Sequence, residues 1–185
     1  RNICNNMKSI LITGGTGLIG SGLVKSIDKS IYKVYVLTRK KPYVENEVDY
    51  INWDPDKSIL DISHIKNLYS VINLAGQSID GSRWTKKYKQ KILESRVNST
   101  RLLFNKIKER EQLPKSFISA SATGFYSENT VSPQKENDKP GNNFLSSVVK
   151  EWEKEILRFN SIGIRTTVFR IGLILSKDGG VLKRL

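Results

Sequence analysis

The sequence predicts an α/β fold of the Rossmann type, with a doubly wound, mainly parallel sheet. Short apolar segments alternate along the chain with segments whose apolar residues recur at helical spacing, which is the pattern of repeated strand–helix–strand units. Three glycines spaced three residues apart stand directly between the first apolar segment and the first helical one, as in dinucleotide-binding folds. The composition, with 38% hydrophobic and 26% charged residues among 185, is that of a globular domain large enough for one core.

The predicted strands are short runs rich in isoleucine, valine, leucine and tyrosine, bounded by turn-forming residues. The helical segments are longer, and Val97, Phe104 and Ile107 keep helical spacing in the second of them. Residues 127–142 are rich in Asn, Ser, Pro, Lys and Glu and are predicted to form a long loop, a kind of segment that is often functional. We expect strands over 8–13, 32–38, 48–53, 70–74, 115–120 and 164–170, and helices from the glycines to residue 28, over 85–110 and over 143–159.

We expect residues 1–7 to be an N-terminal extension and residues 8–185 to form one NAD(P)-binding domain that stops before a C-terminal, substrate-binding part. No apolar run approaches the roughly 20 residues of a membrane span, and the first residues lack the apolar stretch of a secretory signal. The single cysteine, Cys4, excludes an intramolecular disulfide and fits a reducing compartment. The sequence therefore predicts a cytoplasmic protein with no membrane partner, and it leaves the oligomeric state open.

The chain carries 31 basic and 18 acidic residues, which gives a net charge of +13. Such an excess is typical of proteins that bind nucleic acid or phosphate groups, but a general abundance of Lys, Asn and Ile explains it as well. Many basic residues fall between Arg83 and Arg110 without the interleaved aromatics that stack on bases, so no nucleic-acid partner is expected. The lone His64 and the remote Cys4 cannot form a zinc site, so no metal is expected.

Gly14, Gly17 and Gly20 are predicted to form a phosphate-binding loop. Glycine permits a turn with positive φ and lets the backbone approach a pyrophosphate without an intervening Cβ. The N-terminus of the following helix then offers unpaired N–H groups and the positive end of its dipole to the phosphates. The loop lacks the Gly-Lys-Ser/Thr ending of nucleotide triphosphatases. The other residues of the loop that we expect to contact the cofactor are Thr16, Leu18 and Ile19.

The end of the second predicted strand indicates which dinucleotide binds. An NAD-binding domain usually places Asp or Glu there, about 20 residues past the loop, to hold the ribose 2′-hydroxyl. Here the sequence reads Thr38-Arg39-Lys40-Lys41 and contains no acid. Arg39 can hold a 2′-phosphate through charge-assisted hydrogen bonds, so NADP(H) is the predicted cofactor and NAD(H) is less favoured. The alternative is a solvated basic turn.

Seven short motifs occur together in this chain. They are GGTGLIG at 14–20, NLAG at 73–76, RWT at 83–85, ESRVNST at 94–100, SASATGFY at 119–126, VKEWE at 149–153 and RIGLIL at 170–175. In this order they resemble the motifs of the extended short-chain dehydrogenase/reductase superfamily and, more narrowly, of its atypical subfamily of NAD(P)-dependent, sugar-nucleotide-epimerase-like proteins. The resemblance covers nearly all of residues 8–185.

The resemblance implies roles for single residues. Asp54 matches an acid that contacts adenine, unless it only forms an Asp-Pro turn. Ser121 matches the serine or threonine that hydrogen-bonds a substrate hydroxyl or carbonyl, unless it is merely a small residue at a strand end. The remaining positions that match residues lining the cofactor are Leu74, Ala75, Gly76 and Ser119.

The chain departs from the superfamily at the catalytic Tyr-x-x-x-Lys pair, whose tyrosine acts as general acid/base. If Glu153 matches the glutamate that commonly follows the lysine, the tyrosine and lysine positions hold Leu145 and Val149. Tyr126 and Lys150 are the nearby candidates for a substitute catalytic role, although packing and solvation explain them as well.

Two functions remain open. The first is an NADP-dependent oxidoreductase or epimerase that acts on a small molecule such as a nucleotide-linked sugar, with hydride transfer near Ser121. The second is an NADP(H)-binding sensor or structural protein without catalysis. An intact glycine loop in a chain that lacks the catalytic Tyr-x-x-x-Lys pair is what this function predicts. Arg96, which stands where the superfamily often has asparagine, is suited either to bind a phosphate or to form a surface salt bridge.

Overall fold

A mainly parallel sheet forms the centre of the molecule, in a computed structural model that describes residues 7–127 and 132–180. The strands are β1 (Lys8–Thr13), β2 (Tyr32–Thr38), β3 (Tyr43–Glu45), β4 (Val48–Asp54), β5 (Ile59–Leu60), β6 (Leu68–Asn73), β7 (Ser116–Ala122), β8 (Arg165–Ile171), β9 (Leu175–Ser176) and β10 (Gly179–Gly180). The sheet runs in the order β3–β4–β2–β1–β6–β7–β8, with β5 paired to β4 beside this path. Every neighbouring pair on the path is parallel except β3 and β4. The predicted α/β fold is therefore confirmed.

The strand order reverses at β1. From β1 the sheet continues to β2 and β4 on one side and to β6, β7 and β8 on the other. At such a point the connections leave the carboxyl ends of neighbouring strands in opposite directions, and ligands of open α/β sheets bind in the crevice between them. Gly14 directly follows β1, so the glycine loop lies at this switch point.

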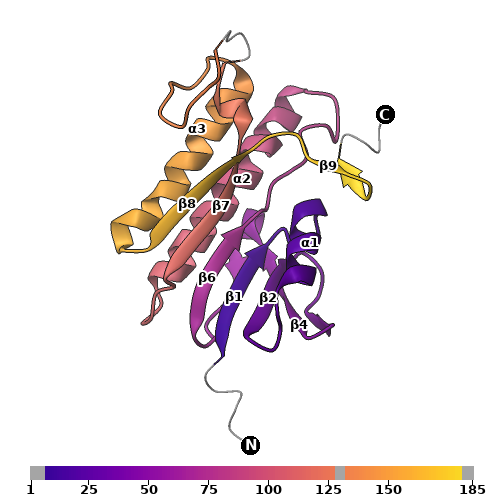
Figure 1. Cartoon of the computed structure of the whole chain (residues 1–185), viewed down its shortest axis with the longest axis vertical. Helices are drawn as coiled ribbons and strands as arrows, with labels where there is room; N and C mark the ends of the chain where they lie inside the picture. The colour runs from indigo at the N-terminus through magenta and orange to yellow at the C-terminus, as the bar shows by residue number, and fades with distance from the viewer. Residues whose placement is uncertain (1–6, 128–131, 181–185) are drawn as a thin grey trace, which may run out of the picture.

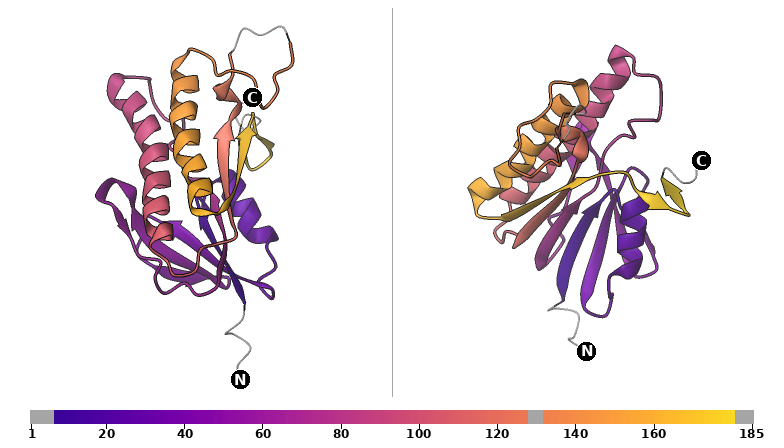
Figure 2. Two further views of the ribbon diagram at one scale, coloured as in Figure 1. Left: turned by 90° about the vertical axis from the view of Figure 1, so that its left-hand side faces the viewer. Right: turned by 45° about the horizontal axis from the view of Figure 1, so that its top comes forward.

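Helices cover both faces of the sheet. They are α1 (Leu18–Ser26), α2 (Lys86–Lys108) and α3 (Phe144–Leu157), together with the short 3-10 helices η2 (Pro55–Lys57), η3 (Thr123–Phe125) and η4 (Arg158–Ile162). On one face Val24 of α1 belongs to a core with Ile12 and Val36. On the other face Leu103 of α2 and Trp152 of α3 belong to a larger core. Figure 1 shows α1 against one side of the sheet, and Figure 2 shows α2 and α3 side by side along the other.

The two long helices begin within one residue of their predicted positions, and a polar side chain starts each. Thr85 accepts a hydrogen bond from the Tyr88 amide at 3.2 Å. Asn143 accepts one from the Ser146 amide at 2.8 Å. These caps satisfy amide groups that the first turn of a helix leaves unpaired, so the local sequence fixes where α2 and α3 begin.

Several details differ from the expectations. The helix α1 ends at Ser26, two residues early, because the chain turns to an extended conformation at Ile27. The strands β3, β5, β9 and β10 were not predicted, since each has only two or three residues and too little pattern to detect. Most of the expected extension, Cys4 included, and residues 128–131 and 181–185 lie outside the described residues. Within the described residues, none of the helices is both long and apolar enough to span a membrane.

Candidate functional site

The glycine loop forms a tight turn that only glycine fits. Gly14 has φ of +67°, and a Cβ on it would lie 2.6 Å from the carbonyl oxygen of Leu74. A Cβ on Gly20 would collide with the carbonyl oxygen of Gly14. Gly17 caps α1 without any side-chain hydrogen bond, and no acidic residue occupies the first turn. The first amides of α1 therefore remain available to an anion, as the helix dipole favours.

A buried hydrogen-bond network fixes the backbone around this turn. The Thr13 hydroxyl accepts hydrogen bonds from the amides of Leu74 at 3.0 Å and Ala75 at 3.1 Å, and it donates to Asn73 Oδ1 at 2.7 Å. The Asn73 amide nitrogen donates in turn to the hydroxyls of Thr100 at 3.2 Å and Ser119 at 3.1 Å. Every hydroxyl of the network thus has a partner, which holds the ends of β1 and β6 and the middle of β7 together beside the loop.

Ser119, which was expected to contact the cofactor, belongs to this hydrogen-bond network. Its side chain is fully buried, and its hydroxyl is bound to Asn73 beneath the loop. Ser119 is not among the residues that line either cavity beside the loop. Its contact with the cofactor remains a prediction, and the structure gives it a role in fixing Asn73.

The larger of the two cavities, of about 550 Å³, extends from the glycine loop toward the carboxyl end of β7. Its wall is mostly apolar, and Arg96 is the one charged residue among the described residues that line it. The predicted site residues that it brings together are Gly14, Gly17, Leu18, Ile19, Gly20, Leu74, Ala75, Gly76 and Ser121.

The smaller cavity, of about 310 Å³, lies on the other side of the loop at the ends of β2 and β4. It shares Gly14, Ala75 and Gly76 with the larger cavity, so the two meet at the glycine turn. The predicted residues Thr16 and Arg39 line it, and none of the described residues in its lining is Asp or Glu. The two cavities therefore border the same glycine turn.

Asp54 lies beside the smaller cavity, and its carboxylate contacts residues that follow it closely in the chain. Its carboxylate accepts a hydrogen bond from the Asp56 amide at 3.1 Å and lies 3.6 Å from Lys57 Nζ. Its neighbours Trp53 and Pro55 line the cavity. The carboxylate therefore caps η2, and the predicted contact of Asp54 with adenine is left for the proposal below.

Ser121 belongs to a polar cluster between β7, α3 and β8. Its hydroxyl donates to Glu153 Oε1 at 2.5 Å. The same carboxylate accepts from Arg170 Nε at 2.9 Å and Arg170 Nη2 at 2.8 Å, a two-point geometry that is strong for its type. Hydrogen bonding to Glu153 raises the pKa of Arg170, against the opposing effect of burial. The pair is almost buried, with 10% of the Glu153 and 19% of the Arg170 side chain exposed.

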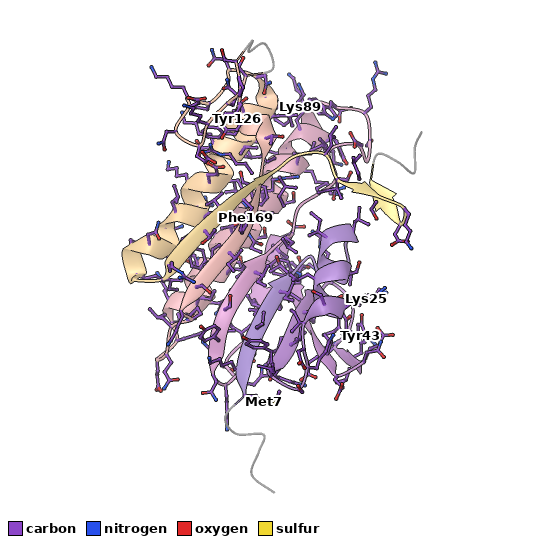
Figure 3. All side chains as sticks on the ribbon, in the orientation of Figure 1. Met7, Lys25, Tyr43, Lys89, Tyr126 and Phe169 are labelled. Atoms are coloured by element: carbon purple, nitrogen blue, oxygen red, sulfur yellow. The ribbon has the colours of Figure 1, made fainter. Side chains whose placement is uncertain are left out.

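The two predicted substitutes for the catalytic pair lie outside the cavity lining. The Tyr126 hydroxyl accepts a hydrogen bond from Arg170 Nη1 at 2.7 Å, and Figure 3 shows Tyr126 at the end of the molecule where α3 begins. Lys150 is exposed on α3. By contrast, Leu145 and Val149, which would stand at the tyrosine and lysine positions if Glu153 matches the family's glutamate, line the larger cavity. Both side chains are hydrocarbon.

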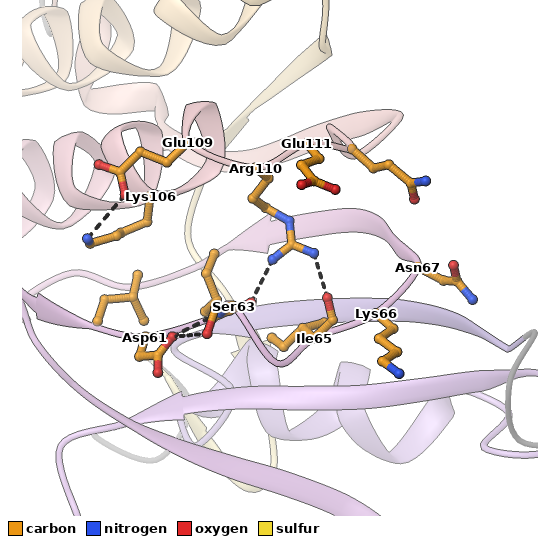
Figure 4. A pocket seen from close by; sticks show the side chains of 12 residues that line it. Asp61, Ser63, Ile65, Lys66, Asn67, Lys106, Glu109, Arg110 and Glu111 are labelled. Carbon is orange, nitrogen blue, oxygen red and sulfur yellow. Dashed lines mark hydrogen bonds and ion pairs between the residues drawn. The ribbon is translucent and has the colours of Figure 1, made fainter.

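A separate cavity of about 660 Å³ lies at the opposite edge of the sheet, between the end of α2 and the loop before β6 (Figure 4). Arg110 bridges this loop by donating from Nη1 to the Ile62 carbonyl at 2.6 Å and from Nη2 to the Ile65 carbonyl at 2.5 Å. Ligands of parallel α/β sheets bind at the carboxyl ends of the strands, whereas this cavity is at the amino ends. We therefore assign Arg110 to the stability of the loop.

The geometry defines a class of protein: an α/β fold with a tight glycine turn between two cavities at its switch point is an NAD(P)-binding fold. Residues 10–158 match the NAD dependent epimerase/dehydratase family, and the chain belongs to that family. The predicted resemblance is thereby confirmed.

Curated relatives carry the name of epimerase family protein. The chain is 40% identical to Epimerase family protein SAR0825 of Staphylococcus aureus over 181 residues, which are 97% of this chain and 59% of the relative. It is also 40% identical to Epimerase family protein SSP1921 of Staphylococcus saprophyticus, over 95% of this chain and 58% of the relative. The chain thus spans somewhat more than half the length of these relatives.

Solved structures of related proteins share the fold. The human epimerase family protein SDR39U1 (isoform 2), solved with NADPH, superposes with a TM-score of 0.81 at 26% identity, over 95% of this chain and 57% of the human one. A nucleoside-diphosphate sugar epimerase from Corynebacterium glutamicum superposes with a TM-score of 0.79 at 29% identity, over 97% of this chain and 37% of the other. Both similarities extend over nearly all of this chain.

Proposed function

We propose that this chain binds NADP(H) across the two cavities and prefers it to NAD(H). The smaller cavity carries the proposal, because Arg39 and Lys40 line it and none of its described lining residues carries a carboxylate. A carboxylate there would accept the ribose 2′-hydroxyl of NAD(H) and repel a 2′-phosphate, whereas a guanidinium favours the phosphate. The NADPH in the structure of human SDR39U1 supports this choice.

In this proposal each part of the cofactor has its own residues. The amides at the start of α1, exposed by Gly14, Gly17 and Gly20, hold the diphosphate. Trp53 and Pro55 line the adenine end, and Asp54, which stands between them in the chain, contacts adenine in this proposal. The larger cavity takes the nicotinamide, with Leu74, Ala75 and Gly76 along its wall.

We further propose that the chain is part of an oxidoreductase or epimerase whose substrate is a small hydroxyl or carbonyl compound, such as a nucleotide-linked sugar. The name of the Corynebacterium glutamicum neighbour supports this class. NADP(H), when bound, supplies or accepts a hydride at its nicotinamide ring. Ser121 lies in the wall of the same cavity, and its own proton is directed to Glu153. Its oxygen therefore offers lone pairs, so that Ser121 accepts a hydrogen bond from a substrate hydroxyl.

A second candidate, an NADP(H)-binding sensor or structural protein without catalysis, is favoured by the lining of the larger cavity. Efficient proton transfer needs a side chain that titrates near neutral pH within reach of the reacting group. Of the described residues that line this cavity, Arg96 alone is ionisable, and an arginine does not exchange its proton near neutral pH. Both candidates share the cofactor site, and they differ only in turnover.

We propose a cytoplasmic location under either function, because the single cysteine favours a reducing compartment.

Titration of the chain with NADPH and NADH, followed by nucleotide fluorescence, tests the shared site. We expect NADPH to bind at least tenfold more tightly, because one charge-assisted contact is worth about 1.5–3 kcal/mol. Equal affinities would overturn the NADP(H) preference. Incubation of the NADP⁺ complex, which can accept a hydride, with nucleotide sugars then separates the candidates. Turnover that is lost in Ser121→Ala supports the enzyme, and tight NADPH binding without turnover supports the sensor.

A further inference from the structure

Arg96 of α2 is held in the wall of the larger cavity beside two neighbours. Its guanidinium carbon lies 5.4 Å from the centroid of the Trp152 ring, within the range of a cation–π contact. Gly76 is also close, because a Cβ added to it would lie 3.2 Å from the same carbon. Nη1 donates to the Ile92 carbonyl, one turn earlier in the helix, at 2.9 Å. These contacts fix the guanidinium at the cavity and use one of its five N–H groups.

The charge of Arg96 has no carboxylate partner among the described residues. Arg101, Arg158 and Arg170 each form an ion pair with a glutamate of α3, and Arg96 forms none. Partial burial lowers the pKa of Arg96, because loss of solvent disfavours the charged guanidinium. Arg96 is partly buried, and a partly buried cation without a counter-charge is costly. A fold that keeps one in the wall of a ligand cavity, with donors to spare, is suited to receive an anion there.

We propose that Arg96 binds a carboxylate or phosphate group of the substrate, a role that rests on the proposed cofactor site. The start of α1 already supplies the positive end of a helix dipole to the cofactor diphosphate. Trp152, which the guanidinium faces, directly precedes Glu153, and Glu153 holds Ser121 in the same cavity. The substrate class is therefore an anionic hydroxyl or carbonyl compound whose acidic group reaches Arg96 while its hydroxyl reaches Ser121.

The test uses the full chain saturated with NADPH and labelled for NMR of arginine and tryptophan side chains. D-glucuronate and inorganic phosphate serve as anionic probes, and D-glucose is the neutral match of D-glucuronate. We expect both anions to shift the Arg96 Nε and Trp152 Nε1 signals in a saturable way, and glucose to leave them unchanged. Arg96→Gln is expected to weaken anion binding by about 10- to 100-fold, since it removes hydrogen bonds to a charged group. Arg96→Lys should retain part of the binding.

The matched control is Arg101→Gln, on the same helix but outside the cavity lining, and it should bind the anions as the parent chain does. NADPH affinity of Arg96→Gln within threefold of the parent value supports a substrate role. A tenfold loss of NADPH affinity would overturn the proposal, because Arg96 would then bind the cofactor diphosphate. Absence of any anion-specific shift at Arg96 in the parent chain would also overturn it, without requiring a folded variant. If NADPH itself does not bind, the cofactor proposal fails. Titration of the nucleotide-free chain with D-glucuronate and phosphate then tests Arg96 separately: saturable shifts of its Nε signal support anion binding, and their absence overturns it.

Discussion

The hydroxyl of Ser121 donates a 2.5 Å hydrogen bond to the carboxylate of Glu153. Arg170 binds the same carboxylate through two of its nitrogens. The arrangement directs the Ser121 proton away from the cavity and leaves the serine oxygen as an acceptor. It also links the candidate substrate residue on β7 to both α3 and β8, so the orientation of Ser121 depends on the packing of three elements.

We expect Glu153→Gln to lower the free energy of unfolding by about 3 kcal/mol, because it leaves the nearly buried Arg170 without its counter-charge. Urea denaturation monitored by circular dichroism measures the change. Glu151→Gln, on the exposed side of the same helix, is the matched control and should change stability by less than about 0.5 kcal/mol. Equal stability of the two variants would show that the Glu153–Arg170 pair contributes little.

The glycine loop gives a second prediction. Gly14→Ala should both destabilise the chain and abolish nucleotide binding, because its φ is positive and the added Cβ would lie 2.6 Å from a carbonyl oxygen. Gly22→Ala is the matched control, since Gly22 lies in α1 and, beyond its chain neighbours and the backbone of its own helix, no described atom lies within 4 Å of the added Cβ. There the gain in helix propensity should stabilise the chain by up to about 1 kcal/mol. Nucleotide binding that survives in Gly14→Ala would contradict the assignment of the loop.

The cofactor preference depends on Arg39 in our proposal. Arg39→Ala should weaken NADPH binding by about 10- to 100-fold and leave NADH binding nearly unchanged, because only NADPH carries the 2′-phosphate. Lys41→Ala removes a nearby basic residue that does not line the cavity, and it should have little effect on either nucleotide. Calorimetric titration of both variants with both nucleotides measures the difference. Equal losses for NADPH and NADH in Arg39→Ala would place Arg39 elsewhere on the cofactor.

Glu155 provides a prediction about pH. Its carboxylate joins α2 to α3 by pairing with Arg101 and Arg158. Burial alone would raise the pKa of Glu155, but hydrogen bonds from the two arginines outweigh it and hold the pKa below its ordinary value of 4.5. A group with a lowered folded-state pKa stabilises the fold above its unfolded-state pKa, and this stability is lost as the pH falls through the folded-state value.

The stability difference between the parent chain and Glu155→Gln should therefore be constant near neutral pH and shrink below about pH 4.5. Urea denaturation at several pH values between 3 and 7 measures it. A difference that does not change with pH in this range would contradict the assigned role of the Glu155 carboxylate.

The parts of the fold that the sequence predicted depend on local chemistry. Gly14 and Gly20 must be glycine because of the turn they make. The pattern of three glycines between a strand and a helix is therefore enough to locate the loop. The starts of α2 and α3 are also set locally, because the Thr85 and Asn143 side chains accept hydrogen bonds from amides in the first turn of each helix. The lack of an acid after β2 was likewise visible in the sequence, and Arg39 does line the smaller cavity.

The parts that could not be predicted depend on contacts between distant segments. Glu153 and Arg170 are 17 residues apart and meet only because α3 packs beside β8. Ser119 and Asn73, 46 residues apart, bond across neighbouring strands, so no local pattern shows that Ser119 faces the network. A polar Glu153 on the buried side of α3 was the available signal that a partner existed.

A crystal structure of the chain grown with NADPH tests the central claim most directly. We predict one NADPH molecule that crosses the glycine turn, with its diphosphate at the first amides of α1 and its 2′-phosphate against Arg39. Its nicotinamide should lie in the cavity that Ser121 lines. Nucleotide bound in the cavity beside Arg110, or crystals without bound nucleotide at saturating NADPH, would contradict the account.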